Sequence, residues 1–183
     1  MNYTNLIKKC TEGDPKSQKE LYELLKGRLM GICLRYNRDQ DEANDVFQET
    51  MIRVFKNIQQ AQHVDNLMGW VTRIATNVAI DHHRKKRTDL MVNMDDNEVA
   101  ELTSEEIGII EMLETKEILR LIQQLPLNYS LVFNLYIIDG YSHKEISDQM
   151  GIAESTSRVI LTRAKQRMAE LLKKTEIRNY VYG

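Results

Sequence analysis

The sequence predicts an all-α protein made of two small helical domains that are joined by a flexible acidic linker. Its 183 residues include only 8 Gly and 2 Pro beside many Leu, Ile, Val and Met, a composition typical of helical proteins. Apolar residues recur at steps of three and four through most of the chain, which is the spacing of a helix with one buried face. The distribution of charge then divides the chain into three parts.

Residues 1–87 carry 15 Lys and Arg against 11 Asp and Glu. Residues 88–115 carry 9 acidic residues and no Lys or Arg, and residues 116–183 carry 10 basic residues against 7 acidic ones. The overall net charge of -2 therefore conceals two basic parts and an acidic connector. We assign 1–87 and 116–183 to the two domains and 88–115 to a linker that leads into a helix.

The first long helix is marked by Asp14-Pro15, an N-cap residue followed by a first-turn proline. We expect its buried stripe to contain Leu21, Leu24, Leu25, Leu29, Ile32, Cys33 and Tyr36. The polar residues 37–41 should end it. The two cysteines, Cys10 and Cys33, lack the spacing of a metal or redox motif, and Cys33 is expected to be a small core residue.

The next helix begins near Asp41. Its predicted buried face consists of Ala43, Val46, Phe47, Thr50, Met51, Val54, Phe55 and Ile58. A different face, expected to be exposed, carries Asp45, Gln48, Glu49 and Ile52. This helix thus offers carboxylates and an amide to a partner, after which residues 59–66 form a polar connector.

A further helix carries the core stripe Leu67, Trp70, Val71, Ile74, Ala75 and Val78. A second row lies beside that stripe at helical spacing and consists of Arg73, Asn77, Asp81 and Arg84. The helix ends in a basic run, and we expect a phosphate-facing patch formed by His82, His83, Arg84, Lys85, Lys86 and Arg87. Cations in such a patch provide salt-dependent affinity for nucleic acid.

The C-terminal part begins with the acidic residues 88–102, whose composition favours a mobile linker. Residues 104–106 form a candidate cap for a helix that enters the second domain. After Leu125-Pro126 we expect another amphipathic helix, which buries Leu131, Val132, Leu135 and Tyr136.

The last two helices have the pattern of a helix-turn-helix. Ser142 and Glu145 fit a capping box, and Gly151 is well placed to end the helix that they start. Ala153 cannot cap the following helix with a hydroxyl, so Ser155 is the candidate cap. That helix presents a mostly polar, basic stripe of Ser155, Arg158, Val159, Thr162, Arg163 and Gln166. Such a stripe after a helix-turn-helix favours DNA contact.

The run Asp45-Val46-Phe47-Gln48-Glu49-Thr50-Met51, then Trp70-Val71-Thr72-Arg73-Ile74-Ala75-Thr76-Asn77, and then Asp81 and Arg84 resemble region two of the extracytoplasmic-function (ECF) group of bacterial sigma factors. Residues 125–172 resemble region four of the same family. The resemblance implies a region-two domain over 1–87 and a region-four helix-turn-helix domain over 116–183.

The resemblance also implies roles for these residues. The row with Asp45, Gln48, Glu49 and Ile52 would dock on core RNA polymerase. The melted downstream promoter strand would be held by His63, Arg73, Asn77, Asp81, Arg84 and Lys85. Residues for the upstream promoter duplex would be Ser142, Lys144, Ser155, Arg158, Val159, Thr162, Arg163 and Gln166. Val159 and Ile160 stand where the family usually has polar residues, so the base contacts of this chain should differ.

The leading hypothesis is a non-enzymatic, cytoplasmic initiation factor, with core RNA polymerase and promoter DNA as partners and an anti-sigma factor as a further candidate. No catalytic residue, metal or cofactor is expected. Promoter melting by such a factor needs no ATP, and the sequence accordingly has no Walker-type or dinucleotide-type Gly-rich loop. No segment is apolar enough to predict insertion into a membrane.

Two alternative functions agree less well with the sequence. A helix-turn-helix regulator that binds duplex operators without polymerase would leave the Asp45, Gln48 and Glu49 face without a purpose. A metal phosphoesterase using Asp81, His82 and His83 is disfavoured, because consecutive helical residues point about 100° apart and cannot converge on one ion.

Overall fold

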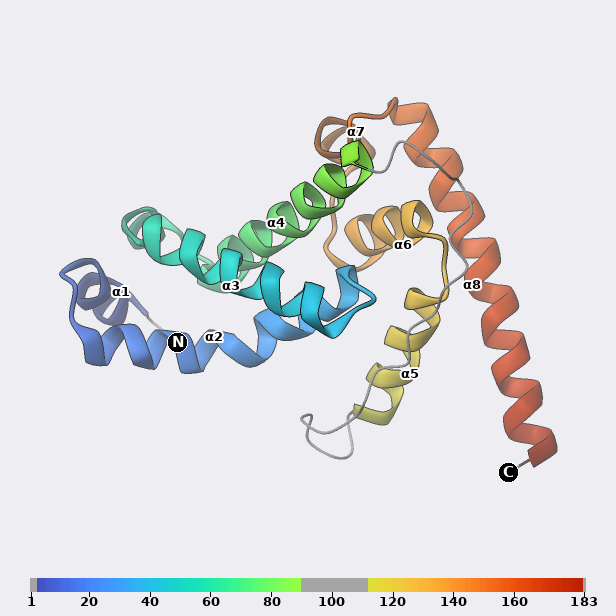
Figure 1. The fold of residues 1–183 in the computed structure, drawn as a ribbon, viewed down its shortest axis with the longest axis horizontal. Coiled ribbons are helices and arrows are strands. Elements are labelled where there is room, and N and C mark those ends of the chain that lie inside the picture. The colour runs from blue at the N-terminus through green and yellow to red at the C-terminus, as the bar shows by residue number, and fades with distance from the viewer. Residues whose placement is uncertain (1–2, 90–111, 183) are drawn as a thin grey trace. The chain divides into compact units, whose positions relative to one another are not determined.

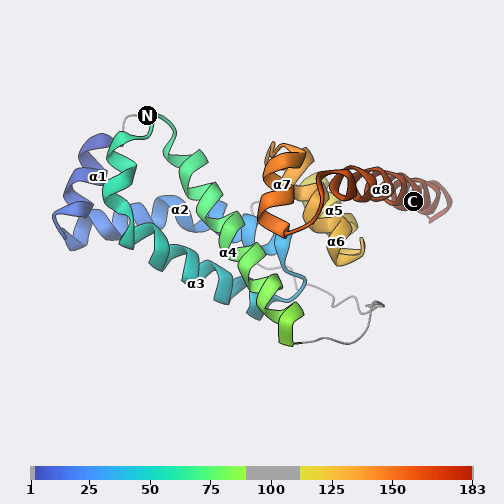
Figure 2. The ribbon, with the colours of Figure 1, turned by 90° about the horizontal axis from the view of Figure 1, so that it is seen from above.

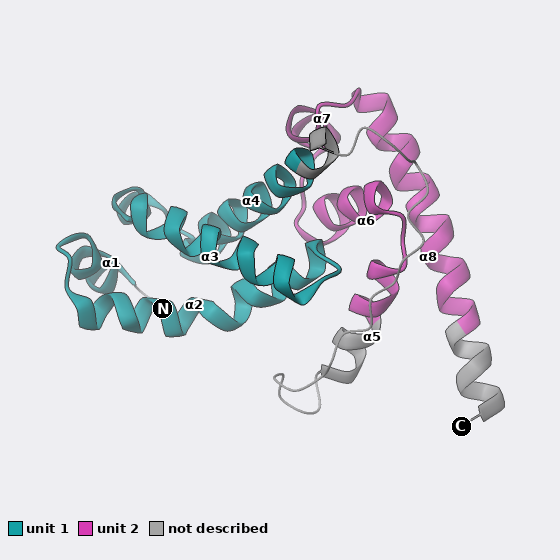
Figure 3. Cartoon of the chain, viewed as in Figure 1, with its two compact units in different colours: residues 1–86 teal, residues 87–183 magenta. Residues whose placement is uncertain are grey.

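The computed structural model describes residues 3–89 and 112–182, and it describes side chains within 3–85 and 118–174. The described residues form helices and no strand, so the all-α prediction is confirmed. The chain divides into two compact units, Met1–Lys86 and Arg87–Gly183, which Figure 3 distinguishes by colour. Each unit is described by itself below.

Unit 1 contains α1 (Thr4–Thr11), α2 (Pro15–Tyr36), α3 (Gln40–Lys56), the short 3-10 helix η1 (Ile58–His63) and α4 (Leu67–Asp89). In this unit α2 packs along α3, and α1 contacts both α2 and η1 (Figures 1 and 2). The connector expected between α3 and α4 is therefore largely helical. Ile58 and Ala61 are buried in η1 and fix it to the domain.

The predicted start of α2 is confirmed. The Asp14 carboxylate accepts hydrogen bonds from the Ser17 hydroxyl at 2.6 Å and from the Ser17 backbone N–H at 2.9 Å. These bonds favour the charged carboxylate and lower the pKa of Asp14. Pro15 then occupies the first turn, where its missing N–H costs no hydrogen bond.

The core of unit 1 forms where the apolar faces of α2, α3 and α4 meet. Its buried residues include Leu21, Leu25, Leu29, Cys33, Tyr36, Val46, Met51, Val54, Val71, Ala75 and Val78. Burial raises the pKa of the Cys33 thiol to about 12, so this cysteine is an inert core residue as predicted.

Four residues of the predicted stripes in unit 1 lie outside this core. Leu24 is 38% exposed, because Leu21, Leu25 and Leu29 recur every four residues and leave Leu24 on the neighbouring flank of α2. Phe55, Trp70 and Ile74 are only partly buried.

Unit 2 contains α5 (Met112–Gln123), α6 (Leu127–Phe133), the short π-helix η2 (Asn134–Ile138), α7 (His143–Met150) and α8 (Glu154–Tyr182). Helix α8 packs against α5, α6 and α7. One core cluster joins α5 to α8 and consists of Leu121, Ile122, Leu125, Met168 and Leu171. Further buried residues include Leu131, Leu135, Ile146, Leu161 and Ala164.

The prediction that Tyr136 lies in the core was wrong. The helix that follows Pro126 widens into a π turn, in which the N–H of Asp139 donates to the carbonyl oxygen of Asn134 at 2.9 Å. A π turn inserts one residue and so rotates the following side chains relative to a regular α-helix. Tyr136, Ile137 and Ile138 are consequently exposed.

The predicted helix-turn-helix is confirmed in its local details. Ser142 and Glu145 form both bonds of a capping box at the start of α7. Gly151 adopts φ +65° at the end of α7, the left-handed conformation that glycine reaches without a Cβ penalty.

The candidate cap of the last helix was wrong. Helix α8 begins at Glu154, and the carbonyl oxygen of Ala153 accepts the backbone N–H of Ser157 at 3.0 Å. Ser155 therefore lies inside the first turn rather than before it.

Most of the acidic linker, residues 90–111, lies outside the described residues, and so does its candidate cap at 104–106. Residues 88 and 89 belong to α4, and residues 112–115 belong to α5. No helix in the described ranges is long and apolar enough to cross a membrane.

Candidate docking and nucleic-acid interfaces

The polar row predicted on α3 lies on the surface of unit 1. Asp45, Gln48, Glu49 and Ile52 are all exposed. Ile52 is a large apolar side chain that is 48% exposed, while Val46 and Thr50 on the opposite side of the helix are buried. The row thus combines two carboxylates, an amide and an apolar group on one accessible face.

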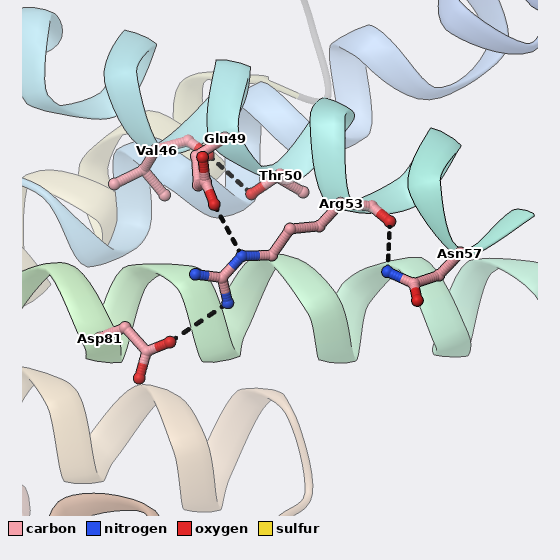
Figure 4. A network of polar contacts seen from close by, with 6 residues as sticks. All are labelled: Val46, Glu49, Thr50, Arg53, Asn57 and Asp81. Carbon is pink, nitrogen blue, oxygen red and sulfur yellow. Dashed lines mark hydrogen bonds and ion pairs between the residues drawn. The ribbon is translucent and has the colours of Figure 1, made fainter.

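Arg53 connects this row to α4, as Figure 4 shows. Its Nε donates to Glu49 Oε1 at 2.8 Å, and its NH1 donates to Asp81 Oδ2 at 3.2 Å. The hydrogen bond to Glu49 is the largest cause that raises the pKa of Arg53. No sequence pattern predicts this bridge, because residues 53 and 81 are neighbours only in the tertiary structure.

The row predicted on α4 is partly exposed. Arg73, Arg84 and Lys85 are exposed, whereas Asn77 and Asp81 are half-buried. His63 is exposed at the end of η1. The side chains of residues 86 and 87 lie outside the described set.

The prediction that His83 faces phosphates was wrong. His83 is only 8% exposed, and its Nε2 lies 2.6 Å from the carbonyl oxygen of Tyr36 at the end of α2. A carbonyl oxygen only accepts, so Nε2 carries the proton. The ring centroids of His82 and His83 are 6.1 Å apart, and their planes are inclined by 73°. Among the described residues, no cluster of three or more His, Cys, Asp or Glu side chains is arranged to hold a metal ion.

The predicted duplex-facing residues of unit 2 lie on α8 and at the start of α7. All of them are exposed, namely Ser142, Lys144, Ser155, Arg158, Val159, Thr162, Arg163 and Gln166. Some of their polar groups have partners within the domain. The Ser142 hydroxyl donates to Glu145 at 2.8 Å, the Thr162 hydroxyl donates to the Arg158 carbonyl at 3.0 Å, and Arg158 pairs with Glu154.

Sequence reasoning missed a polar contact between the two helices of the helix-turn-helix. His143 Nδ1 lies 2.9 Å from the Ser157 hydroxyl, and the His143 ring stacks on Tyr136 with centroids 4.5 Å apart. Lys165 Nζ lies 6.0 Å from the centre of the Tyr136 ring. Burial and the nearby Arg158 lower the pKa of His143. Ser157 is fully buried in α8, so this contact fixes α7 against the helix that carries the basic stripe.

A helix-turn-helix with an exposed basic second helix, accompanied by a helical unit with a basic α4, defines a DNA-binding transcription protein. Residues 21–88 match the family model of sigma-70 region 2, and residues 115–168 match that of sigma-70 region 4. The chain belongs to the extracytoplasmic-function group of the sigma-70 family of RNA polymerase sigma factors.

Relatives cover most of this chain. It is 28% identical over 154 residues to the ECF RNA polymerase sigma factor SigM of Bacillus subtilis, a match that covers 83% of this chain and 93% of SigM. It is 27% identical over 177 residues to the ECF RNA polymerase sigma factor SigW of the same organism, covering 91% and 95%.

The fold is similar to that of a solved sigma factor, RpoE of Bartonella quintana in complex with the anti-sigma factor NepR. The TM-score is 0.56 at 19% identity, and the match covers 85% of this chain and 96% of that chain.

From the two family models and the two relatives, this protein is a sigma factor that binds core RNA polymerase and directs promoter recognition. The polymerase-independent regulator is not favoured.

Proposed function

We propose that the α3 row of Asp45, Gln48, Glu49 and Ile52 is the surface by which this sigma factor binds core RNA polymerase. The exposure of all four side chains on one face supports this assignment. Stable protein interfaces combine an apolar anchor with polar groups around it. Ile52 supplies the anchor, and the carboxylates of Asp45 and Glu49 suit cationic groups on the partner.

The α4 surface is proposed to hold the melted downstream promoter strand. Arg73, Arg84 and Lys85 are exposed cations that suit phosphates. Asn77 can both donate and accept hydrogen bonds and so suits the edge of an extruded base. His63, at the end of η1, is proposed to contribute to the same strand contact. Favourable capture of a base offsets the cost of local strand opening, so melting at this site needs no ATP.

The exposed stripe of α8 is proposed to read the upstream promoter duplex. A major groove admits one α-helix, and an Arg side chain can bond a guanine edge through two hydrogen bonds. Arg163 is the best candidate for such a contact, because Arg158 pairs with Glu154. Val159, which is 50% exposed, suits an apolar contact such as a thymine methyl group.

The chain is further proposed to act as a non-enzymatic factor in the cytoplasm, where promoter DNA and polymerase meet.

An anti-sigma factor is a candidate inhibitor of this protein. A similar fold supports it, since RpoE of Bartonella quintana was solved with the anti-sigma factor NepR. CnrH, which has a TM-score of 0.50 at 17% identity, was likewise solved with a protein partner, the cytosolic domain of CnrY. Sequestration would show as lost polymerase binding when a helical inhibitor protein is added.

The docking proposal is tested by measuring the affinity of Asp45→Ala and Glu49→Ala variants for core polymerase. Each should weaken binding about fivefold or more, the range in which truncation of an interface residue costs roughly 1 kcal/mol or more. Glu20→Ala, which removes an exposed carboxylate of α2 outside the row, is the matched control. Equal affinities for all three variants and the wild type would contradict the proposal.

The DNA proposals are tested with the assembled holoenzyme. Arg163→Ala should reduce upstream duplex affinity by about 1–3 kcal/mol and relax sequence preference at one position. Arg167→Ala, four residues further along α8 and paired with Glu170 at 2.8 Å, is the matched control.

Asn77→Ala should abolish the preference for one downstream strand, and an unchanged preference would contradict the base-pocket assignment.

A further inference from the structure

Arg53 occupies a position that neither interface alone explains. It extends from the last turn of α3 and contacts a carboxylate on each of two helices (Figure 4). One carboxylate belongs to Glu49 in the polymerase-facing row, at 2.8 Å, and the other to Asp81 in the strand-facing row of α4, at 3.2 Å. A single guanidinium thus joins the two faces of unit 1.

The backbone that carries Arg53 is firmly held. Asn57 Nδ2 donates to the Arg53 carbonyl oxygen at 2.8 Å, which caps the end of α3. One turn earlier, the buried Thr50 hydroxyl donates to the Val46 carbonyl at 2.7 Å. Because Glu49 binds the Nε edge of the guanidinium, the planar group is oriented with NH1 toward α4. Contacts within α3 therefore set the direction of the Arg53 side chain, and the Asp81 carboxylate on α4 accepts a hydrogen bond from its NH1.

Asp81 is the one acidic residue of its row, which otherwise contains Arg73, Asn77 and Arg84. A carboxylate on a surface that binds nucleic acid repels phosphates, so its charge weakens binding unless a cation neutralises it. Arg53 is such a cation, and it reaches Asp81 from a different helix.

We propose that Arg53 is a positioning residue for strand capture, which neutralises Asp81 and turns its carboxylate away from the promoter strand. Asp81 then acts through Arg53 and is not itself a contact to DNA, in contrast to the role that the sequence predicts for it. The inference rests on the proposed strand-binding role of α4 and deepens it. It also makes Glu49 serve twice, once toward polymerase and once in holding the Arg53 side chain.

A double-mutant cycle tests this proposal. Holoenzyme is assembled at saturating core polymerase with wild type, Arg53→Met, Asp81→Asn or both substitutions, and its affinity for a promoter fragment with a single-stranded downstream segment is measured. Arg53→Met should weaken binding about two- to fivefold, the range expected for an exposed ion pair, because it leaves the Asp81 charge uncompensated. When Asp81→Asn is added to Arg53→Met, it should recover the lost affinity, and by itself it should change affinity little.

Two further readouts separate this role from a purely structural one. The loss in Arg53→Met should shrink as salt rises, because exposed charges are screened over about 8–10 Å at 0.1–0.15 M. Arg53→Lys, which keeps the charge without the planar fork, should recover part of the affinity. Lys26→Met removes a cation of unit 1 that pairs with Glu23 within α2, and it should leave strand affinity unchanged.

The proposal is overturned if Asp81→Asn alone lowers strand affinity as much as the double variant does, because Asp81 would then contact DNA directly. It is also overturned if Arg53→Met binds as tightly as wild type. Failure of the strand-binding assignment is recognised separately, since Asn77→Ala would then leave strand preference unchanged.

Discussion

His83 Nε2 donates to the carbonyl oxygen of Tyr36 across 2.6 Å, and the bond joins the last part of α4 to the last residue of α2. Both residues are buried. The carbonyl at a helix end has no partner within its own helix, so a side chain from α4 supplies one. The bond holds the turn of α4 from which the exposed Arg84 and Lys85 emerge.

His83→Leu should therefore destabilise unit 1. The substitution introduces an apolar side chain of similar size and leaves the Tyr36 carbonyl without this donor, a loss of about 1–3 kcal/mol. Urea unfolding followed by the fluorescence of Trp70, the single tryptophan, measures it. His63→Leu is the control, because His63 is exposed and its replacement should change stability by less than about 0.5 kcal/mol.

Ile52→Ala should weaken binding to core polymerase without lowering stability. Ile52 is 48% exposed in the free protein, so truncation removes an apolar contact of the complex and little of the core. The expected loss is about five- to tenfold, consistent with roughly 25 cal/mol for each Å² of apolar surface buried. A titration of labelled protein with core enzyme measures the affinity.

Leu24→Ala is the matched control for this prediction. Leu24 is an exposed apolar residue, 38% accessible, on α2 and outside the α3 row. Equal losses for the two variants would mean that general surface apolarity, and not the row, determines polymerase affinity.

Lowering the pH should loosen the helix-turn-helix. The pKa of His143 in the folded protein lies below its ordinary value of 6.5, first because of burial and then because of the nearby Arg158. The unfolded chain consequently binds a proton more readily, so His143 contributes stability above about pH 6.5 that is lost as pH falls through the folded pKa. Hydrogen exchange of α7 amides, corrected for intrinsic rates, should show decreasing protection between pH 7 and pH 5.

His143→Phe should remove that pH dependence while keeping an aromatic ring against Tyr136. Protection in α7 that still falls with pH in this variant would assign the effect to other groups. Because the variant also removes the bond to the Ser157 hydroxyl, its protection at neutral pH should be lower than that of the wild type.

Gly151→Ala should destabilise unit 2 by about 1–2 kcal/mol, the cost of a left-handed backbone for an L-residue. A Cβ built at Gly151 meets no atom within 4 Å, so the cost comes from φ +65° and not from a clash. Gly151→Asn should cost less, because Asn tolerates this region better. Thermal unfolding monitored by circular dichroism ranks the three proteins, and an equal effect of Ala and Asn would contradict the explanation.

Local sequence signals predicted much of the fold, because each depends on residues close together in the chain. The N-cap at Asp14, the capping box at Ser142 and the left-handed turn at Gly151 are all set within one helical turn. The exposed row of α3 followed from the period of its buried face. The family resemblance then gave those faces their expected partners.

Local patterns of residue type establish the helical character of the chain, most of its buried faces and its membership of the sigma-70 family. The tertiary structure alone decided that His83 is buried against Tyr36, that a π turn exposes Tyr136, and that Arg53 joins Glu49 to Asp81. The physical reason is that periodicity assigns a residue to a face of its own helix, whereas a partner from another helix is fixed only when the helices pack. The pairing of Asp81 with the Arg53 cation is therefore a property of the fold and not of the α4 sequence.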